Sequence, residues 1–152
     1  MDQHPTQLRI EDAYAYLIQR TARLLRRSFL RMSKSAGHDM TPEQWFVLNK
    51  LRQRDGQSQG ELGDAILEDR PNMTRMLKSM EHSGLITRRA DPADGRRVLV
   101  RLTRAGRTAH DAMAKVAFVE RTRVYAGLDA VDFVALKKIL DTINTNLSTD
   151  GA

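Results

Sequence analysis

Two helix starts, eleven residues apart, constrain the fold of this chain more than any other feature. Ser58 can cap a helix that carries Glu61 at its third position, which makes a capping box. Asp69 can cap a second helix, and Pro71 suits the first turn of that helix. A further capping box, at residues 41–44, starts a helix ahead of this pair. Two short helices joined by a tight turn are typical of a helix-turn-helix unit.

The second helix of this pair, expected over residues 70–83, has one apolar and one cationic face. Its apolar residues recur at i, i+3, i+4 and i+7 and share one face: Met73, Met76, Leu77 and Met80. Arg75 and Lys78 lie on the opposite face. Ser83 and Gly84 end the helix. The sequence therefore predicts a helix that packs on a core and exposes cations.

A β-hairpin is expected directly after this helix. Residues 85–89 and 97–102 have the composition of strands, and the segment 91–95 between them holds Asp, Pro and Gly, which favour a turn. A hairpin that follows a helix-turn-helix unit is a wing, here at about residues 86–102. We therefore expect a winged helix-turn-helix lobe over residues 41–103.

Long helices are expected on both sides of this lobe. The last of them carries apolar residues at alternating spacings of three and four: Phe133, Leu136, Leu140, Ile143 and Leu147. The lobe is complete without these helices, so their apolar faces remain to be buried, and pairing with a second copy of the chain buries them economically. The expected fold is a single domain over residues 1–152. It is mainly α with a small two-stranded β-wing, and residues 8–35 and 104–147 form N- and C-terminal dimerisation helices.

Positive charge is concentrated in one segment of the chain. Residues 70–104 hold nine Lys and Arg against three acids, a surplus of six that equals the net charge of the whole chain. A polyanion is the natural partner of such a segment. The segment has no aromatic residue, whereas proteins that bind single strands or RNA loops stack bases on aromatic rings. Double-stranded DNA is therefore the expected partner.

Several other classes of protein are disfavoured by what the sequence lacks. The absence of cysteine excludes disulfides, thiolate metal sites and cysteine nucleophiles, and the four histidines form no ligand cluster. No nucleotide-binding loop or nucleophile elbow is present, so we expect no enzyme, no catalytic residue, no metal and no cofactor. The chain has no apolar run of membrane-spanning length and no signal peptide, which predicts a cytoplasmic protein without a membrane partner.

Several short segments occur in an order that resembles the MarR family of bacterial and archaeal transcription regulators. They are Met73-Thr74-Arg75-Met76-Leu77, Gly84-Leu85-Ile86-Thr87-Arg88, Asp94-Gly95-Arg96-Arg97 and Leu102-Thr103-Arg104-Ala105-Gly106, with Trp45 and Leu62 upstream. The resemblance covers essentially the whole chain. It implies a homodimeric winged helix-turn-helix regulator, usually a repressor, that binds a pseudo-palindromic operator. It also implies release from DNA by a small effector, often phenolic or anionic.

The expected DNA-binding residues lie on the two helices of the helix-turn-helix unit and on the wing: Ser58, Gln59, Arg70, Pro71, Asn72, Thr74, Arg75, Lys78, Arg96 and Arg97. Arg75 can read guanine through two hydrogen bonds, and Lys78 is expected at a phosphate. Asn72 either pairs with adenine or satisfies the backbone of the first turn of its helix. The resemblance implies that Asp94 orients Arg96 through a salt bridge in the wing and that Arg96 enters the minor groove. A narrow minor groove attracts arginine, which agrees with this role.

The resemblance also implies an effector pocket between the dimerisation helices and the DNA-binding lobe. Its candidate lining residues are Phe29, Met32, His38, Trp45 and Met113. Ordinary core packing explains the apolar members of this set equally well. The alternative function is an architectural or protein-interaction winged-helix module with little preference for DNA sequence, and the ratio of specific to non-specific affinity separates the two.

Overall fold

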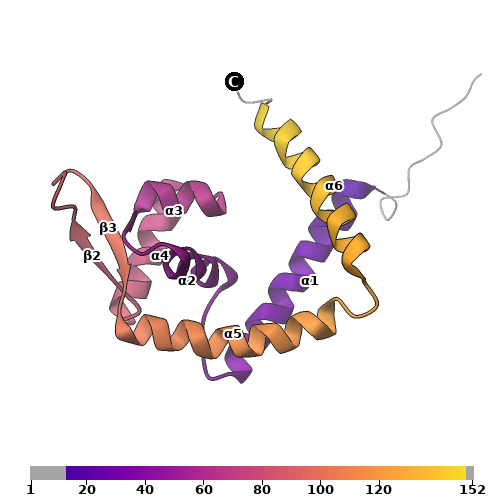
Figure 1. Ribbon diagram of the computed structural model, residues 1–152, viewed down its shortest axis with the longest axis horizontal. Coiled ribbons are helices and arrows are strands. Elements are labelled where there is room, and N and C mark those ends of the chain that lie inside the picture. Colours follow the sequence, from indigo (N-terminus) through magenta and orange to yellow (C-terminus); the bar gives the residue numbers. More distant parts are fainter. Residues whose placement is uncertain (1–12, 150–152) are drawn as a thin grey trace, which may run out of the picture. The chain divides into compact units, whose positions relative to one another are not determined.

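The computed structural model of the chain describes residues 13–149, and residues 1–12 and 150–152 lie outside this range. The elements follow in the order α1 (Tyr14–Ser35), α2 (Pro42–Gln53), β1 (Gln57–Ser58), α3 (Gln59–Ile66), α4 (Arg70–His82), β2 (Ile86–Ala90), β3 (Val98–Leu102), α5 (Arg104–Val124) and α6 (Ala130–Thr149) (Figure 1). The chain divides into two compact units, residues 1–117 and 118–152, with the boundary inside α5. The helix expected from residue 8 is described from Tyr14 onward, and the earlier part of that prediction lies outside the described residues.

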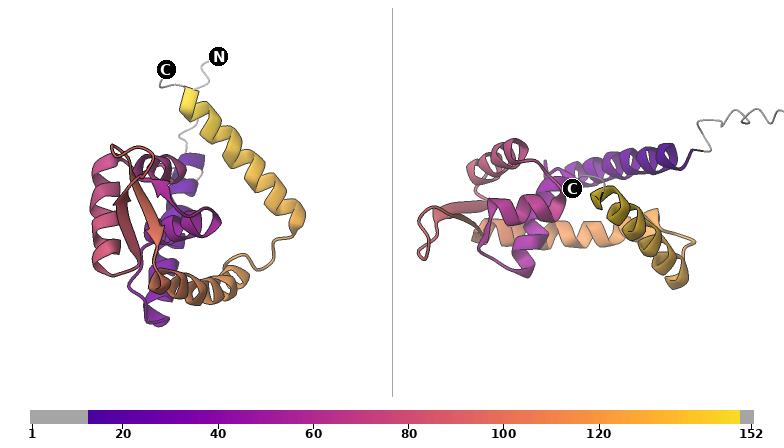
Figure 2. Two further views of the ribbon diagram at one scale, coloured as in Figure 1. Left: turned by 60° about the vertical axis from the view of Figure 1, so that its left-hand side comes forward. Right: turned by 90° about the horizontal axis from the view of Figure 1, so that it is seen from above.

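The predicted hairpin is confirmed. Strands β2 and β3 pair antiparallel, with Ile86 opposite Leu102 and Ala90 opposite Val98. The hairpin projects past α3 and α4, and Figure 2 gives two further views of it. A short third strand, β1, was not expected: it pairs antiparallel with β3 and gives the sheet order β1-β3-β2. A strand of two residues has no readable periodicity, which is why the sequence pattern does not reveal it.

The helix starts predicted from capping residues are confirmed. At α3 the Ser58 hydroxyl accepts a hydrogen bond from the backbone N–H of Glu61 at 3.2 Å, and the Glu61 carboxylate accepts one from the backbone N–H of Ser58 at 2.7 Å. The Asp69 carboxylate accepts from the backbone N–H of Asn72 at 2.8 Å and caps α4. Thr41 and Gln44 form the same reciprocal pair at α2. Side chains close to each helix in sequence therefore fix where it begins.

The turn between α3 and α4 is tight enough to require an unusual backbone conformation. Leu67 ends α3 with a φ of 55°, in the left-handed region that glycine usually occupies. A Cβ on Gly63 would lie 3.1 Å from the carbonyl oxygen of Glu68 and 3.2 Å from the Met73 side chain, so the two helices approach closely there. The close approach explains why a small residue occupies position 63 and fixes how α4 leaves α3.

One hydrophobic core holds the helix-turn-helix unit, the sheet and the first half of α5 together. Its members are Met40, Val47, Leu48, Leu51, Leu62, Met73, Leu77, Met80, Ile86, Val100, Leu102 and Met113. Met73, Leu77 and Met80 are the predicted inner face of α4, and Met76 packs against the edge of the core. Burying a side chain of this size stabilises a fold by about 1.5–3 kcal/mol. The core therefore fixes which face of α4 points outward.

Long apolar faces remain exposed outside this core. On α1 they are formed by Tyr14, Leu17, Ile18, Leu24, Leu25 and Leu30. In the unit of residues 118–152 they are formed by Phe118, Val119, Val131, Val134, Leu136, Ile139, Leu140 and Leu147. Within that unit, Tyr125 packs edge-on against Phe133 with ring centroids 5.6 Å apart. Over residues 13–149 the structure has no helix with both the length and the apolar character needed to cross a membrane.

Candidate nucleic-acid interface

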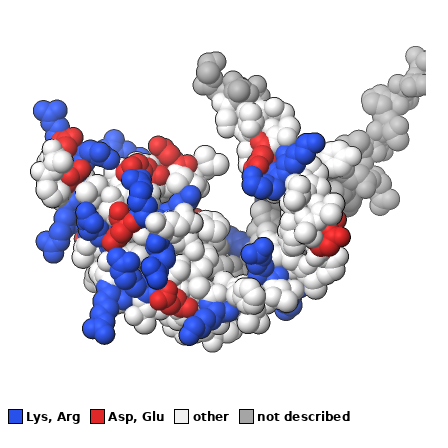
Figure 3. Space-filling model, in the orientation of Figure 1, with Lys and Arg blue, Asp and Glu red and all other residues white. Residues whose placement is uncertain are grey.

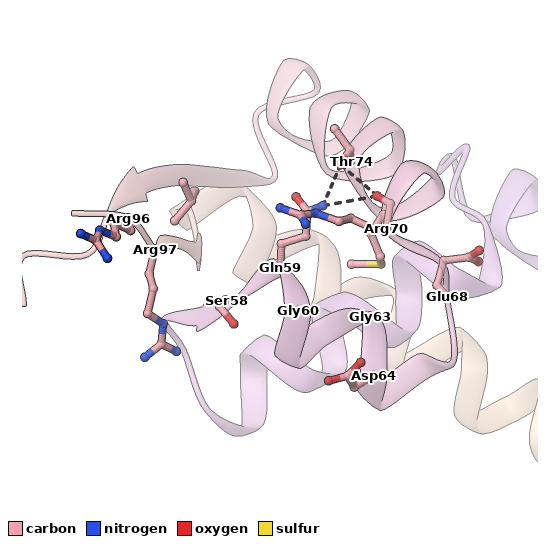
Figure 4. Close-up of a pocket in the computed structure, with 12 residues that line it drawn as sticks. Ser58, Gln59, Gly60, Gly63, Asp64, Glu68, Arg70, Thr74, Arg96 and Arg97 are labelled. Carbon is pink, nitrogen blue, oxygen red and sulfur yellow. Dashed lines mark hydrogen bonds between the residues drawn. The ribbon is translucent and has the colours of Figure 1, made fainter. Parts of the chain in front are cut away.

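A cleft of about 540 Å³ lies between α3, the first turns of α4 and the loop end of the wing. Its lining residues are Ser58, Gln59, Gly60, Gly63, Asp64, Glu68, Arg70, Met73, Thr74, Arg96, Arg97 and Val98 (Figure 4). The structure thus brings together six of the ten residues predicted to bind DNA. Arg96 and Arg97 lie at one end of the cleft in Figure 4, and Asp64 and Glu68 lie at the other.

Two of these predicted residues join α3 to α4. The Gln59 amide donates hydrogen bonds to the Thr74 hydroxyl at 2.7 Å and to the backbone carbonyl of Arg70 at 3.4 Å. The Thr74 hydroxyl in turn donates to the same carbonyl at 2.9 Å (Figure 4). Gln59 and Thr74 therefore hold the first turn of α4 against α3, a structural role that the sequence did not indicate.

The outer face of α4 carries the predicted cations. Arg75 and Lys78 are exposed on the side opposite the buried methionines. Arg75 donates a hydrogen bond to the side-chain oxygen of Asn72, and the Asn72 amide nitrogen donates to Glu68 and Asp69. Arg75 is thus held in place on its own helix. The exposed side chain of Lys78 has no hydrogen bond or ion pair to another residue of the described segment 13–149.

In the wing, the contact between Asp94 and Arg96 differs from the expected salt bridge. The Asp94 carboxylate accepts a hydrogen bond from the backbone N–H of Arg96 at 3.0 Å, and the backbone carbonyl of Asp94 accepts one from the N–H of Arg97 at 2.9 Å. No ion pair joins the two side chains among the described residues. Asp94 therefore shapes the turn that presents Arg96 and leaves the exposed guanidinium uncommitted.

Glu61, in the first turn of α3, also forms ion pairs that connect α3 to the wing. The sequence pattern predicted its capping role but not these ion pairs. Its carboxylate pairs with Arg54 at 2.9 Å and with Arg97 at 3.4 Å. The hydrogen bond from the backbone N–H of Ser58, followed by that from Arg54, lowers the pKa of the Glu61 carboxyl to about 2. The group is therefore charged at neutral pH and draws Arg97 toward α3.

Two further acids fix the wing and were not singled out in the sequence. Glu81, near the end of α4, accepts hydrogen bonds from the Arg88 guanidinium at 2.9 and 2.7 Å, and this contact lowers the pKa of the Glu81 carboxyl. Asp55 accepts from the backbone N–H of Leu102 at 2.9 Å and from the side chain of Arg107 at 2.8 Å. These contacts join residues 7 to 52 positions apart, so local sequence patterns could not reveal them.

Lys and Arg side chains gather over the wing, α3 and α4 on the face drawn in Figure 3. This distribution agrees with the surplus of six positive charges that the sequence carries in residues 70–104. A surface of this kind raises the local concentration of phosphate groups and favours binding to nucleic acid.

The predicted effector residues lie in or against the core of the lobe. Met113 is buried, and Phe29, Met32 and Trp45 pack against the same cluster. The face of the Trp45 ring stacks on His110 of α5, with ring centroids 4.9 Å apart and an interplanar angle of 19°. His110 was not among the candidates, because residues so far apart in the chain share no sequence pattern. His38 holds the end of α1 through its backbone carbonyl, which accepts a hydrogen bond from the Ser33 hydroxyl at 3.0 Å.

Comparison with known proteins agrees with this geometry. The model of the MarR family matches residues 40–98, which span α2 to the start of β3. A probable transcriptional regulator from Pseudomonas aeruginosa has a TM-score of 0.80 and 27% sequence identity, covering 89% of this chain and 99% of that one. The transcriptional repressor CouR, bound to a 23-mer DNA duplex, has a TM-score of 0.80 and 27% identity, covering 91% of this chain and 99% of that one. BpsR of Bordetella bronchiseptica has a TM-score of 0.82 and 23% identity, covering 93% and 98%.

The fold and the cationic surface together define a winged-helix transcription regulator that binds DNA. Residues 40–98 match the MarR family, and the chain shares the fold of transcriptional regulators along most of its length.

Proposed function

We propose that the chain is a repressor that binds a pseudo-palindromic operator as a homodimer and is released by a small effector. The observation that carries this proposal is the outward face of α4. The buried methionines fix the helix so that Arg75 and Lys78 face solvent, next to a wing that presents Arg96. The site of action is the cytoplasm, where the DNA of bacteria and archaea lies.

On DNA, α4 enters the major groove as the recognition helix, and the wing reaches the adjacent minor groove. Arg75 contacts a base edge, whereas Lys78 and Arg70 contact phosphates. Arg96 inserts its planar guanidinium into the minor groove, which is narrow and strongly negative at A·T-rich sequences. Arg97, now paired with Glu61, adds a phosphate contact beside it.

The exposed apolar faces support a homodimer. Residues 8–35 and 104–147 would form its dimerisation helices, with the lobe of residues 41–103 left free for DNA. Exposed apolar area of this extent is rare on monomers and typically marks an interface. A two-fold dimer presents two recognition helices, which fit half-sites about 34–36 Å apart, one turn of the duplex.

Similar proteins support an effector. The DNA binding of BpsR is regulated by 6-hydroxynicotinic acid, and PcaV from Streptomyces coelicolor has a crystal structure in complex with its natural ligand. We place a small phenolic or anionic molecule near Phe29, Met32, His38, Trp45 and Met113, where His110 stacks on Trp45. Trp45 is the only tryptophan of the chain, so its fluorescence reports directly on this region. The test is to add 6-hydroxynicotinic acid and to measure both the Trp45 fluorescence and the affinity for DNA. If neither quantity changes, the result counts against that ligand.

Affinity for a sequence enriched from random duplexes, compared with a shuffled duplex of the same composition, tests the proposed function. A regulator binds the enriched sequence about 10³-fold or more tightly. The alternative, an architectural module, binds both duplexes equally. A variant with Arg75, Lys78 and Arg96 all changed to alanine is the matched control, since these exposed side chains contribute little to the fold.

A further inference from the structure

The side-chain amide of Asn72 has three polar partners around the start of α4. Its nitrogen donates to the carboxylate of Glu68 at 3.0 Å and to that of Asp69 at 2.7 Å. Its oxygen accepts a hydrogen bond from the guanidinium of Arg75. The two carboxylates thus hold the amide, and the amide holds the arginine.

The chemistry of these partners fixes the orientation of the amide. Carboxylates only accept hydrogen bonds and guanidinium groups only donate them, so the amide nitrogen must face Glu68 and Asp69 and the oxygen must face Arg75. Reading adenine requires an asparagine to offer one N–H to N7 and its oxygen to the N6 amino group. Both N–H groups of Asn72 are already engaged, and a pairing with adenine would break this arrangement.

Arg75 is fixed by this contact without being neutralised. The neutral amide, and not a carboxylate, is its direct partner, so the positive charge remains available to DNA. The contact uses one of the five N–H groups of the guanidinium, and the others remain for a bidentate pair with guanine. A side chain held in position before binding loses less conformational freedom when the complex forms.

We propose that Asn72 is a positioning residue that holds Arg75 in the orientation needed to read a guanine in the operator. The inference rests on the proposed function, because it assigns a base to the recognition helix. Sequence reasoning left Asn72 between an adenine contact and a backbone contact. The geometry favours a third role, in which Asn72 acts on DNA only through Arg75.

The test is selection from a random duplex library with four proteins: wild type, Asn72→Ala, Arg75→Ala and the double variant. Asn72→Ala leaves the backbone N–H that Asp69 caps and introduces a good helix former, so α4 stays folded. We expect Arg75→Ala to lose preference for one guanine per half-site by about 5- to 160-fold, the range of one bidentate pair. Asn72→Ala loses part of the preference at that same position, and the double variant matches Arg75→Ala.

Lys78→Ala is the matched control on the same face of α4. It should weaken binding to all duplexes alike and leave base preference unchanged, as loss of a phosphate contact does. Loss of an adenine preference at a different position in Asn72→Ala, with the guanine preference intact, would overturn the inference. So would additive losses in the double variant, or an Arg75→Ala protein with unchanged preference. A wild-type protein that enriches no sequence would overturn the proposed function and this inference together.

Discussion

Among the described glycines, Gly106, in the first turn of α5, is the one where an added Cβ would lie nearest to another atom. A Cβ on Gly106 would lie 2.0 Å from the carbonyl oxygen of Leu85 and 3.0 Å from its carbonyl carbon. That carbonyl accepts hydrogen bonds from the backbone N–H and the hydroxyl of Thr103, both at 3.1 Å. Because the obstacle is backbone that holds α5 on the sheet, Gly106→Ala must separate the helix from the start of β2.

The expected cost combines two effects. Overpacking costs about 1–3 kcal/mol, and the disturbed hydrogen bonds at Leu85 add about 1 kcal/mol. We therefore expect a loss of about 2–4 kcal/mol in the free energy of unfolding, and a melting temperature lower by roughly 4–16 °C for a chain of this size. Urea denaturation followed by circular dichroism measures the first quantity.

Gly95→Ala is the control for this prediction. A Cβ on Gly95 meets no atom within 4 Å, so the stability of that variant should stay within about 0.5 kcal/mol of wild type. A Gly106→Ala protein as stable as wild type would refute the close packing of α5 against the sheet.

Three further predictions concern the candidate interface. Arg96→Ala should weaken operator binding about tenfold or more. The melting temperature should not change, because the backbone N–H of residue 96 still donates its hydrogen bond to Asp94. If a titration shows that the variant binds the operator as tightly as wild type, the role of the wing is contradicted. The lowered pKa of Glu61 stabilises the fold above about pH 4.5, and this contribution is lost as the pH falls toward 2. The effect is small, because the side chain is 38% exposed, and Glu61→Gln should flatten the acid limb of stability measured against pH. Gln59→Ala and Thr74→Ala should show non-additive losses of stability in a double-mutant cycle, whereas additive losses would mean that their hydrogen bond contributes nothing.

The parts of the fold that could be predicted depend on neighbours in the sequence. The cap at Ser58, the cap at Asp69 and the apolar stripe of α4 all arise from residues within one or two turns of each other. The hairpin was predicted for the same reason, since its strands and turn are consecutive. Local physics of this kind sets the type and order of the elements.

The parts that could not be predicted depend on residues that meet only after folding. Strand β1 exists because residues 57–58 reach β3, which lies much later in the chain. The contact between Trp45 and His110 joins α2 to α5. In the interface, residue types predicted DNA contact for Gln59 and Thr74, but the folded chain also uses their polar groups to join two helices. The charge and residue types of the sequence predicted a DNA-binding surface. They did not distinguish the side chains that contact DNA from the side chains that hold those contacting side chains in position.

The most direct test of the central claim is the pattern of bases that the wild-type protein enriches from random duplex DNA. We predict an inverted repeat with half-site centres about 10–10.5 base pairs apart, as two recognition helices related by two-fold symmetry require. Affinity for that sequence should fall steeply with salt, since several phosphates are neutralised at once. An enriched single half-site would contradict the dimer, and the absence of any enriched sequence would contradict the assignment of a specific operator-binding repressor.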